Sequence, residues 1–182
     1  VENYLDALRM DVAVSIDAAT KETFEAIRVG ASFDEVMANR DRFLEITRSH
    51  GRTLAMNFCL MTNNWHELHL MCLEADRIDV ELQVIPVFYP AEFSPMCLPD
   101  DELAEIVEQL EVIDREVRPK LGRNRPIWDG TLDLLRDHRQ RAERNEIPVA
   151  LRSRQITRSK PEPVRALVDL EAWSDGDPIV FE

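Results

Sequence analysis

The sequence predicts an α/β fold in which parallel strands lie inside and helices lie outside. Three short apolar runs, within residues 11–16, 53–60 and 80–88, are typical of buried strands. The stretches between them carry helical periodicity and are long enough to cross over between parallel strands. Continuous apolar strands separated by such helices favour a sheet covered by helices. At 182 residues, the chain is long enough for one ordinary domain with a hydrophobic core.

The first predicted strand, Asp11–Ile16, ends in a polar turn. Asp17 opens this turn, and Thr20 then stands where a side chain can cap a helix that runs through Arg28. The sequence therefore predicts a strand, a turn and a short helix in this order.

A longer helix follows the short one. Ser32 and Glu35 have the spacing of a capping box, and apolar residues recur at helical intervals after them. Gly51 is well placed to end this helix. The segment thus predicts the outer helix between the first two strands.

The second and third predicted strands are joined by another helix. The strand at 53–60 is followed by Asn64 and Glu67, which begin a helix whose apolar residues line one side. The strand at 80–88 comes next, so the whole stretch reads as a βαβαβ unit.

Helices dominate the remaining sequence. Four prolines, Pro86, Pro90, Pro95 and Pro99, break the chain from the end of the third strand onward, and an amphipathic helix then starts at Asp100 and closes at Pro119. The acidic residues at its start complement the helix dipole. A polar connector at 120–126 precedes a second helix from about Asp129 to Arg144. We divide the chain into a strand-containing part (1–118), a helical, Arg-rich extension (119–163) and the start of a further module (164–182).

Charge and hydropathy restrict the function classes. The net charge is −13, which argues against nonspecific binding to nucleic acid. Residues 121–160 run against this trend with ten Lys or Arg and five Asp or Glu, which fits either a solvated helix face or a docking surface for an acidic partner or RNA. The apolar runs are too short to cross a bilayer, and no leader opens the sequence, so we expect a cytoplasmic protein without a membrane partner.

The residues alone give little chemistry. The three cysteines, Cys59, Cys72 and Cys97, are spaced too widely for a zinc or cluster motif and are expected to be free thiols. His66 and His69 lie three apart, without the four-residue spacing of a zincin helix. The chain has five glycines and none are clustered into a phosphate-binding loop.

Three spaced segments carry a resemblance to a known family. The run Val14-Ser15-Ile16-Asp17-Ala18-Ala19-Thr20, the run Glu22-Thr23-Phe24-Glu25-Ala26-Ile27-Arg28 and the run Phe33-Asp34-Glu35-Val36 resemble the fourth strand and following helices of the radical S-adenosylmethionine (SAM) superfamily. The resemblance is closest to the branch that often carries SPASM or twitch domains. Residues 54–61 and 80–88 look like its fifth and sixth strands. The match covers residues 10 to 90 and implies the second half of a parallel β/α barrel.

The resemblance also implies a site for SAM. Ligands of parallel barrels bind at the carboxyl ends of the strands. In the family, polar groups on and after the fourth strand reach the ribose and methionine ends of SAM, and an arginine faces its carboxylate. The residues that match these positions, or lie beside the sugar and adenine on the next two strands, are Ser15, Asp17, Arg28, Asn57, Leu60, Met61 and Val87.

The chain departs from the family pattern in one respect that decides its activity. The Cys-x3-Cys-x2-Cys loop that holds the [4Fe-4S] cluster is absent, and so are the auxiliary-cluster cysteines of a SPASM domain. We expect the chain to be a fragment whose cluster ligands lie upstream of Val1 and which is inactive alone. The intact parent would be an oxidoreductase-type enzyme that receives electrons from a reductant protein and cleaves SAM to a 5′-deoxyadenosyl radical. Its substrate stays open, with peptide or protein modification common in the branch.

Two other classes remain. A noncatalytic α/β module that binds a partner predicts no cluster cysteines in the parent. An aldolase-like lyase predicts a lysine at a strand end, and Lys21, Lys120 and Lys160 all lie outside the predicted strands.

Overall fold

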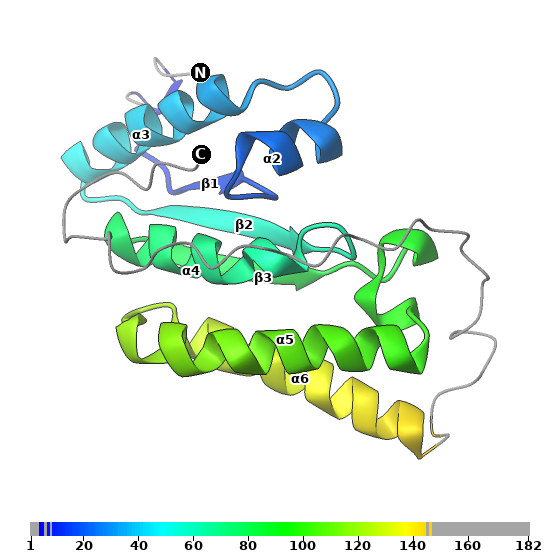
Figure 1. The fold of residues 1–182 in the computed structure, drawn as a ribbon. Coiled ribbons are helices and arrows are strands. Elements are labelled where there is room, and N and C mark those ends of the chain that lie inside the picture. The colour runs from blue at the N-terminus through cyan, green and yellow to red at the C-terminus, as the bar shows by residue number, and fades with distance from the viewer. Residues whose placement is uncertain (1–3, 6, 8, 145, 147–182) are drawn as a thin grey trace.

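The computed structural model describes residues 4–5, 7, 9–144 and 146, and confirms an α/β architecture. Within them, β1 (Val12–Ser15), β2 (Leu54–Leu60) and β3 (Glu81–Pro86) form a parallel sheet in the order β1-β2-β3 (Figure 1). The α-helices are α2 (Lys21–Ile27), α3 (Phe33–Ser49), α4 (Leu68–Arg77), α5 (Asp100–Val117) and α6 (Arg125–Glu143). Short 3₁₀ turns lie at η1 (Trp65–Glu67), η2 (Ala91–Phe93), η3 (Pro95–Cys97) and η4 (Arg118–Lys120).

The predicted caps of the first two helices are confirmed. Thr20 Oγ1 accepts a hydrogen bond from the Thr23 N–H at 3.3 Å, and Ser32 Oγ accepts one from the Glu35 N–H at 3.3 Å. Gly51 follows the end of α3 with a φ of +64°, in the left-handed region where glycine is favoured. Local sequence chemistry therefore sets where these helices begin and end.

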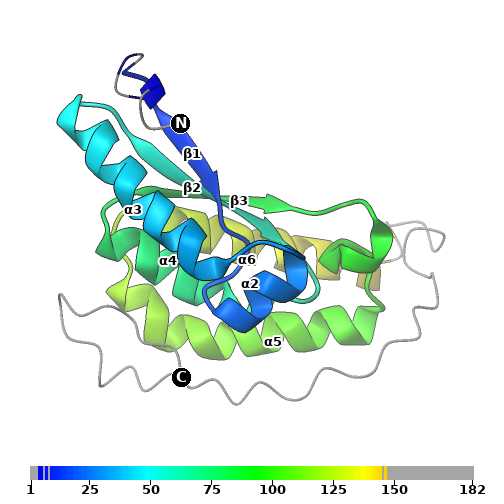
Figure 2. The ribbon, with the colours of Figure 1, turned by 90° about the horizontal axis from the view of Figure 1, so that it is seen from above.

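The sheet has one covered and one open face. On β2, Leu54, Met56, Phe58 and Leu60 are buried, and the residues between them are only partly buried. Side chains alternate between the faces of a strand, so the apolar face packs under the helices. Figure 2 shows α2, α3, α4 and α5 all on the same side of the strands. Within the described residues, no element covers the other face.

β1 is an edge strand of this sheet. Its register pairs Val12 with Leu54 and Ser15 with Asn57 on β2. The Val12 N–H donates to the carbonyl oxygen of Thr53, just before β2, and the Ile16 N–H donates to that of Asn57 on β2. The backbone groups of Ala13 and Ser15 therefore point to the free edge.

The opposite edge of the sheet, at β3, is closed by a side chain. Asn124 is fully buried, and its Oδ1 accepts from the Leu82 N–H at 2.7 Å while its Nδ2 donates to the Val80 carbonyl oxygen at 2.9 Å. Asp76 supports it by accepting from the Asn124 N–H and Nδ2, both at 2.9 Å. One carboxamide thus satisfies the backbone at the amino end of β3 as a neighbouring strand would.

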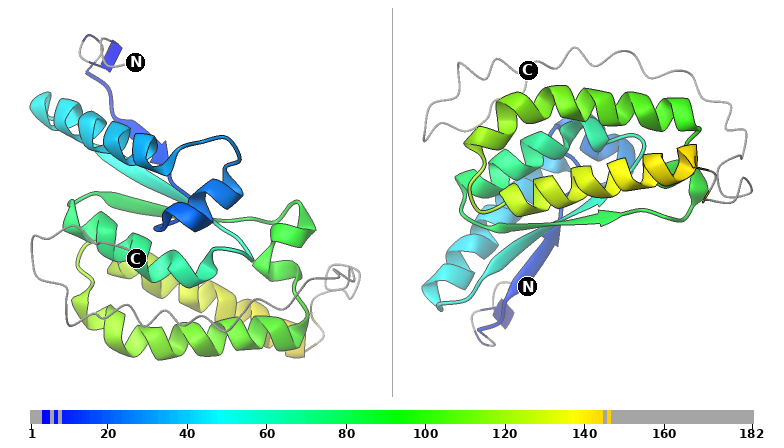
Figure 3. Two further views of the ribbon diagram at one scale, coloured as in Figure 1. Left: turned by 45° about the horizontal axis from the view of Figure 1, so that its top comes forward. Right: turned by 90° about the horizontal axis from the view of Figure 1, so that it is seen from below.

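Helices α5 and α6 pack against one another and share the main core. Figure 3 shows them side by side, with α6 next to β3. Trp128, Leu132 and Leu135 of α6 belong to the same buried cluster as the strands. The prediction that this helix begins near Asp129 was wrong by four residues: it begins at Arg125, because Pro126 fits the first turn, where its missing N–H is not needed.

The arginines of α6 neutralise acids on α5. Arg136 Nε lies 2.9 Å from Glu111 Oε1, and Arg139 Nη2 lies 3.6 Å from Glu108 Oε1. These contacts favour the solvated-face interpretation of the basic stretch up to residue 144. Its remainder and the predicted module at 164–182 lie outside the described residues. In the part of the chain that the structure describes, no helix is long and apolar enough to span a membrane.

Candidate functional site

Polar side chains gather where β1 and β2 end, at the carboxyl edge of the sheet. Asp17 follows β1 and is 2 % exposed. Its Oδ2 accepts from Arg28 Nε at 2.7 Å and forms an ion pair with Arg28 Nη2 at 2.5 Å, and its Oδ1 accepts from the Cys59 N–H at 2.9 Å. The carboxylate therefore joins the end of α2 to the end of β2.

Asn64 ties the same strand ends together through their backbones. It is fully buried, and its Nδ2 donates to the carbonyl oxygens of Asp17 and Cys59, both at 2.8 Å. Its Oδ1 accepts from the Met61 N–H at 2.7 Å. Every hydrogen bond of this carboxamide goes to a backbone group that a loop would otherwise leave unpaired.

Glu67 holds the loop after β1 in the same manner. Its Oε2 accepts from the N–H groups of Ala19 at 2.6 Å and Thr20 at 3.0 Å, and its Oε1 accepts from Thr20 Oγ1 at 2.6 Å. Glu67 is buried, so these bonds to a carboxylate stabilise the loop more than exposed ones would. We call Asn64, Glu67 and Asp17 together the strand-end clamp.

The open face of the sheet carries a polar row next to this clamp. The register places Ser15, Asn57 and Gln83 side by side on the three strands. Ser15 and Gln83 are exposed, but Asn57 Oδ1 is buried and has no hydrogen-bond partner. A buried acceptor without a partner costs about 1–3 kcal/mol. A ligand on this face would recover that cost once the Asn57 side chain rotates to present this oxygen.

The structure separates the predicted site residues into groups. Ser15 and Asn57 lie together on the open face, and Asp17 and Arg28 are paired at the carboxyl edge. Leu60 is fully buried on the helix-covered face, so only its backbone is near the edge, where its carbonyl oxygen accepts from the Val87 N–H at 3.1 Å. Met61 presents its N–H to Asn64.

Asn64 and Glu67 were missed as site residues in the sequence. They were interpreted as the beginning of a helix, but Asn64 makes no side-chain cap and Glu67 turns back to residues 19 and 20. Their contacts with the loop after β1, at residues 17, 19 and 20, span 47 or 48 positions, and no periodicity reports such a distance. The one feature of the sequence that could have indicated them is the pattern Asn-x-x-Glu shortly after an apolar strand.

Burial shifts the titration of the groups around the clamp. It raises the pKa of the Cys59 thiol, and the nearby Asp17 charge raises it further. Burial lowers the pKa of His66, although Glu67 partly opposes this. It also lowers the pKa of His69 to about 4, which keeps this imidazole neutral at physiological pH.

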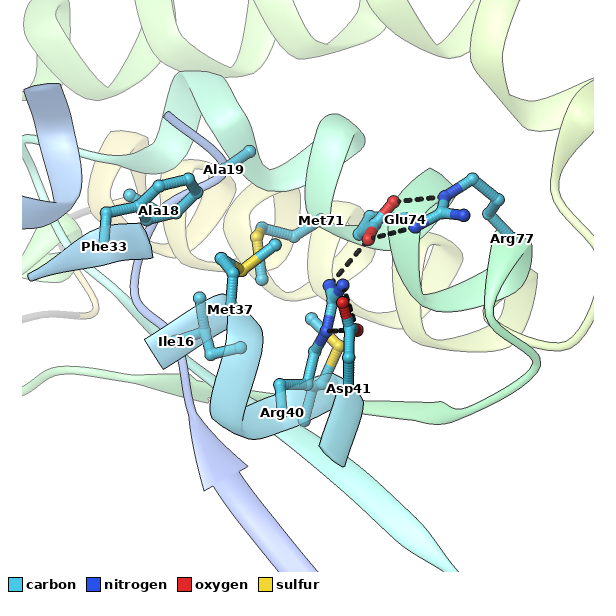
Figure 4. Close-up of a pocket in the computed structure, with 11 residues that line it drawn as sticks. Ile16, Ala18, Ala19, Phe33, Met37, Arg40, Asp41, Met71, Glu74 and Arg77 are labelled. Atoms are coloured by element: carbon cyan, nitrogen blue, oxygen red, sulfur yellow. Dashed lines mark hydrogen bonds and ion pairs between the residues drawn. The ribbon is translucent and has the colours of Figure 1, made fainter. Parts of the chain in front are cut away.

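A second candidate site lies on the helix-covered side, between α3 and α4. Figure 4 shows a cavity with Met37 and Met71 at its middle and Arg40, Glu74 and Arg77 at one end. Its volume is about 180 Å³. Arg40 Nη1 donates to Glu74 Oε1 at 2.6 Å. Burial alone would raise the pKa of Glu74, but the hydrogen bond from Arg77 and the charge of Arg40 lower it.

The charged end of this cavity already satisfies itself. Arg77 Nε donates to Glu74 Oε2 at 2.7 Å, and Arg40 Nε donates to Asp41 Oδ1 at 2.8 Å. Because Asn57 Oδ1 leaves an acceptor without a partner on the open face beside the carboxyl edge, we place the functional site there.

The chain's own residues fit part of the cofactor set that the sequence suggested. The unpartnered Asn57 Oδ1 and the half-exposed Arg28 can receive the donors and the carboxylate of SAM. For an iron-sulfur cluster there is no fit: among the described residues, no group of three Cys, His, Asp or Glu could hold a metal. The three cysteines are free thiols, as predicted, and Cys72 is buried in the core.

We compared the chain with protein families, curated proteins and solved structures. No protein-family model matches the chain, and no curated protein or solved structure matches it significantly.

Proposed function

We propose that the chain forms part of a radical SAM barrel and that the carboxyl edge of its sheet binds SAM. The observation that carries the proposal is the buried, unpartnered Asn57 Oδ1 on an uncovered face of parallel strands. Arg28, which can bind an anion, lies at the adjoining edge. Ligands of parallel α/β sheets bind outside this edge.

The residues of this chain would bind and orient the cofactor. Arg28 offers a permanently charged, planar donor to a carboxylate. Ser15 and Asn57 offer oxygen atoms to hydroxyl or ammonium donors. The chemistry that SAM supplies is its reductive cleavage to methionine and a 5′-deoxyadenosyl radical at a [4Fe-4S] cluster. That cluster would be held by residues other than those described here.

The test uses the protein expressed from the complete reading frame that encodes this chain. After anaerobic reconstitution with iron and sulfide, we expect reductant-dependent formation of 5′-deoxyadenosine from SAM. Arg28→Ala should lower the rate at least about tenfold, because a charge-assisted contact to the carboxylate is lost. Arg52→Ala, an exposed arginine at the amino end of β2, is the matched control and should leave the rate unchanged.

A second candidate function is a noncatalytic module that binds a protein partner. Ile85, Phe88, Tyr89 and Phe93 are large, exposed apolar side chains on and after the end of β3. Exposed apolar side chains that gather on a surface mark interaction sites. A full-length protein that binds no cluster and leaves SAM intact would overturn the first proposal and favour this one.

A further inference from the structure

Asp17 is enclosed by its own hydrogen-bond partners. Both carboxylate oxygens are engaged, Oδ1 by the Cys59 N–H and Oδ2 by two nitrogens of Arg28. The side chain is 3 % exposed, so a ribose hydroxyl or an ammonium group outside the loop does not reach it without displacing one of these donors.

Arg28 is held from one side only. Its Nε and Nη2 bind Asp17, whereas Nη1 has no hydrogen bond among the residues that the structure describes. The side chain is 41 % exposed. A guanidinium is planar, so two contacts on one edge fix the direction of the remaining donors.

The base of this pair is rigid. The Asp17 carbonyl oxygen is bound by Asn64, and its carboxylate by the backbone of β2. A fixed arginine loses less conformational entropy on binding than a free one. The end of β2 therefore holds Asp17 in place, and Asp17 in turn restrains the exposed part of Arg28.

We infer that Asp17 is a positioning residue that aims Arg28 at the carboxylate of the ligand's amino-acid moiety, and that it makes no ligand contact of its own. This inference rests on the proposed function and refines it. It assigns recognition of the amino-acid end to the Asp17–Arg28 pair and recognition of the nucleoside end to the open face.

Binding of two nucleosides can distinguish recognition of the amino-acid end from recognition of the nucleoside end. S-adenosylhomocysteine carries the amino-acid carboxylate, and 5′-methylthioadenosine has the same adenosine and thioether without it. Affinities for both would be measured by calorimetry on the reconstituted full-length protein. Asp17→Asn should weaken S-adenosylhomocysteine at least tenfold and leave 5′-methylthioadenosine within twofold. Once Arg28 is replaced by Ala, Asp17→Asn should have no further effect.

A second variant covers the case in which Asp17→Asn does not fold. Arg28→Lys keeps the charge at a half-exposed position but cannot bind Asp17 with two nitrogens in one plane. It should show the same selective loss, with the thermal unfolding temperature unchanged.

Three outcomes count against the proposals. Equal weakening of both nucleosides by Asp17→Asn or by Arg28→Lys would show a direct nucleoside contact or a collapsed loop and would overturn the inference, as would no weakening of either. If the unchanged protein binds neither nucleoside, the proposed function itself fails.

Discussion

Two buried asparagines bind backbone groups at the two ends of the sheet, and their surroundings differ. Asn124 completes the backbone at the amino end of β3, with Asp76 behind it. Asn64 joins the carboxyl ends of β1 and β2, but its neighbour Asp17 also carries Arg28. In parallel barrels the amino end serves stability and the carboxyl end serves function. The two clusters differ in their carboxylates: the buried Asp17 pairs with the half-exposed Arg28, whereas Asp76 binds Asn124 and the Gly122 N–H.

The largest effect on stability is expected when either asparagine side chain is removed. Asn124→Ala and Asn64→Ala each leave at least two buried backbone groups unpaired, so each should lower the free energy of unfolding by about 4 kcal/mol, measured in urea. Only Asn64→Ala should also weaken S-adenosylhomocysteine in the fraction that stays folded. Asn63→Ala, the exposed neighbour, is the control and should change neither. Equal loss of binding in both variants would remove the distinction.

The cluster at the carboxyl end should also make stability depend on pH, because the buried His69 lies on α4 two residues after Glu67. Burial lowers its pKa to about 4 in the folded protein, from 6.5 when exposed. Between these values the unfolded chain binds more protons, so stability is complete above pH 6.5 and falls as the pH approaches 4. The loss should be about 3 kcal/mol.

The measurement is the free energy of unfolding from pH 7 to pH 4 for the protein and for His69→Gln. The substitution should flatten this part of the curve. An unchanged slope in His69→Gln would show that other groups, such as the Glu74 pair, cause the acid effect.

The smallest effect is expected far from both clamps, on the surface between α5 and α6. Arg136 pairs with Glu111 at 2.9 Å, but its side chain is 37 % exposed. Arg136→Gln should therefore cost about 0.5 kcal/mol or less, and the cost should vanish in 1 M salt. A loss as large as that of the buried asparagines would show that the helix pair depends on its charges.

Periodicity and capping chemistry predicted most of the fold. Thr20 and Ser32 cap their helices through neighbours three residues away, and such local contacts leave a clear pattern in the sequence. The apolar runs predicted the strands within a residue or two at most ends, because the buried face of a strand must be apolar. The helix at 125–143 was predicted too short since its proline was interpreted as a break.

The clamps could not be predicted in this way. Asn64 and Asn124 act on backbone groups of strands distant in sequence, and a backbone partner imposes no residue type on the other side. The pairing of Asp17 with Arg28 is likewise a consequence of how α2 returns to the sheet. Both residues were predicted as site residues from the sequence, but their pairing with each other was not.

The free edge of β1 has a consequence for how the protein is handled. It offers two N–H groups and two carbonyl oxygens beside small, uncharged side chains, Ala13 and Ser15. Sheet edges elsewhere are guarded by lysine, proline or a bulge, and these four residues, Val12–Ser15, carry none of them. Among the described residues no strand pairs with this edge, so an extended segment from this chain or from a second molecule could add to the sheet there. Addition of a segment from a second molecule is bimolecular, so this association should increase with protein concentration.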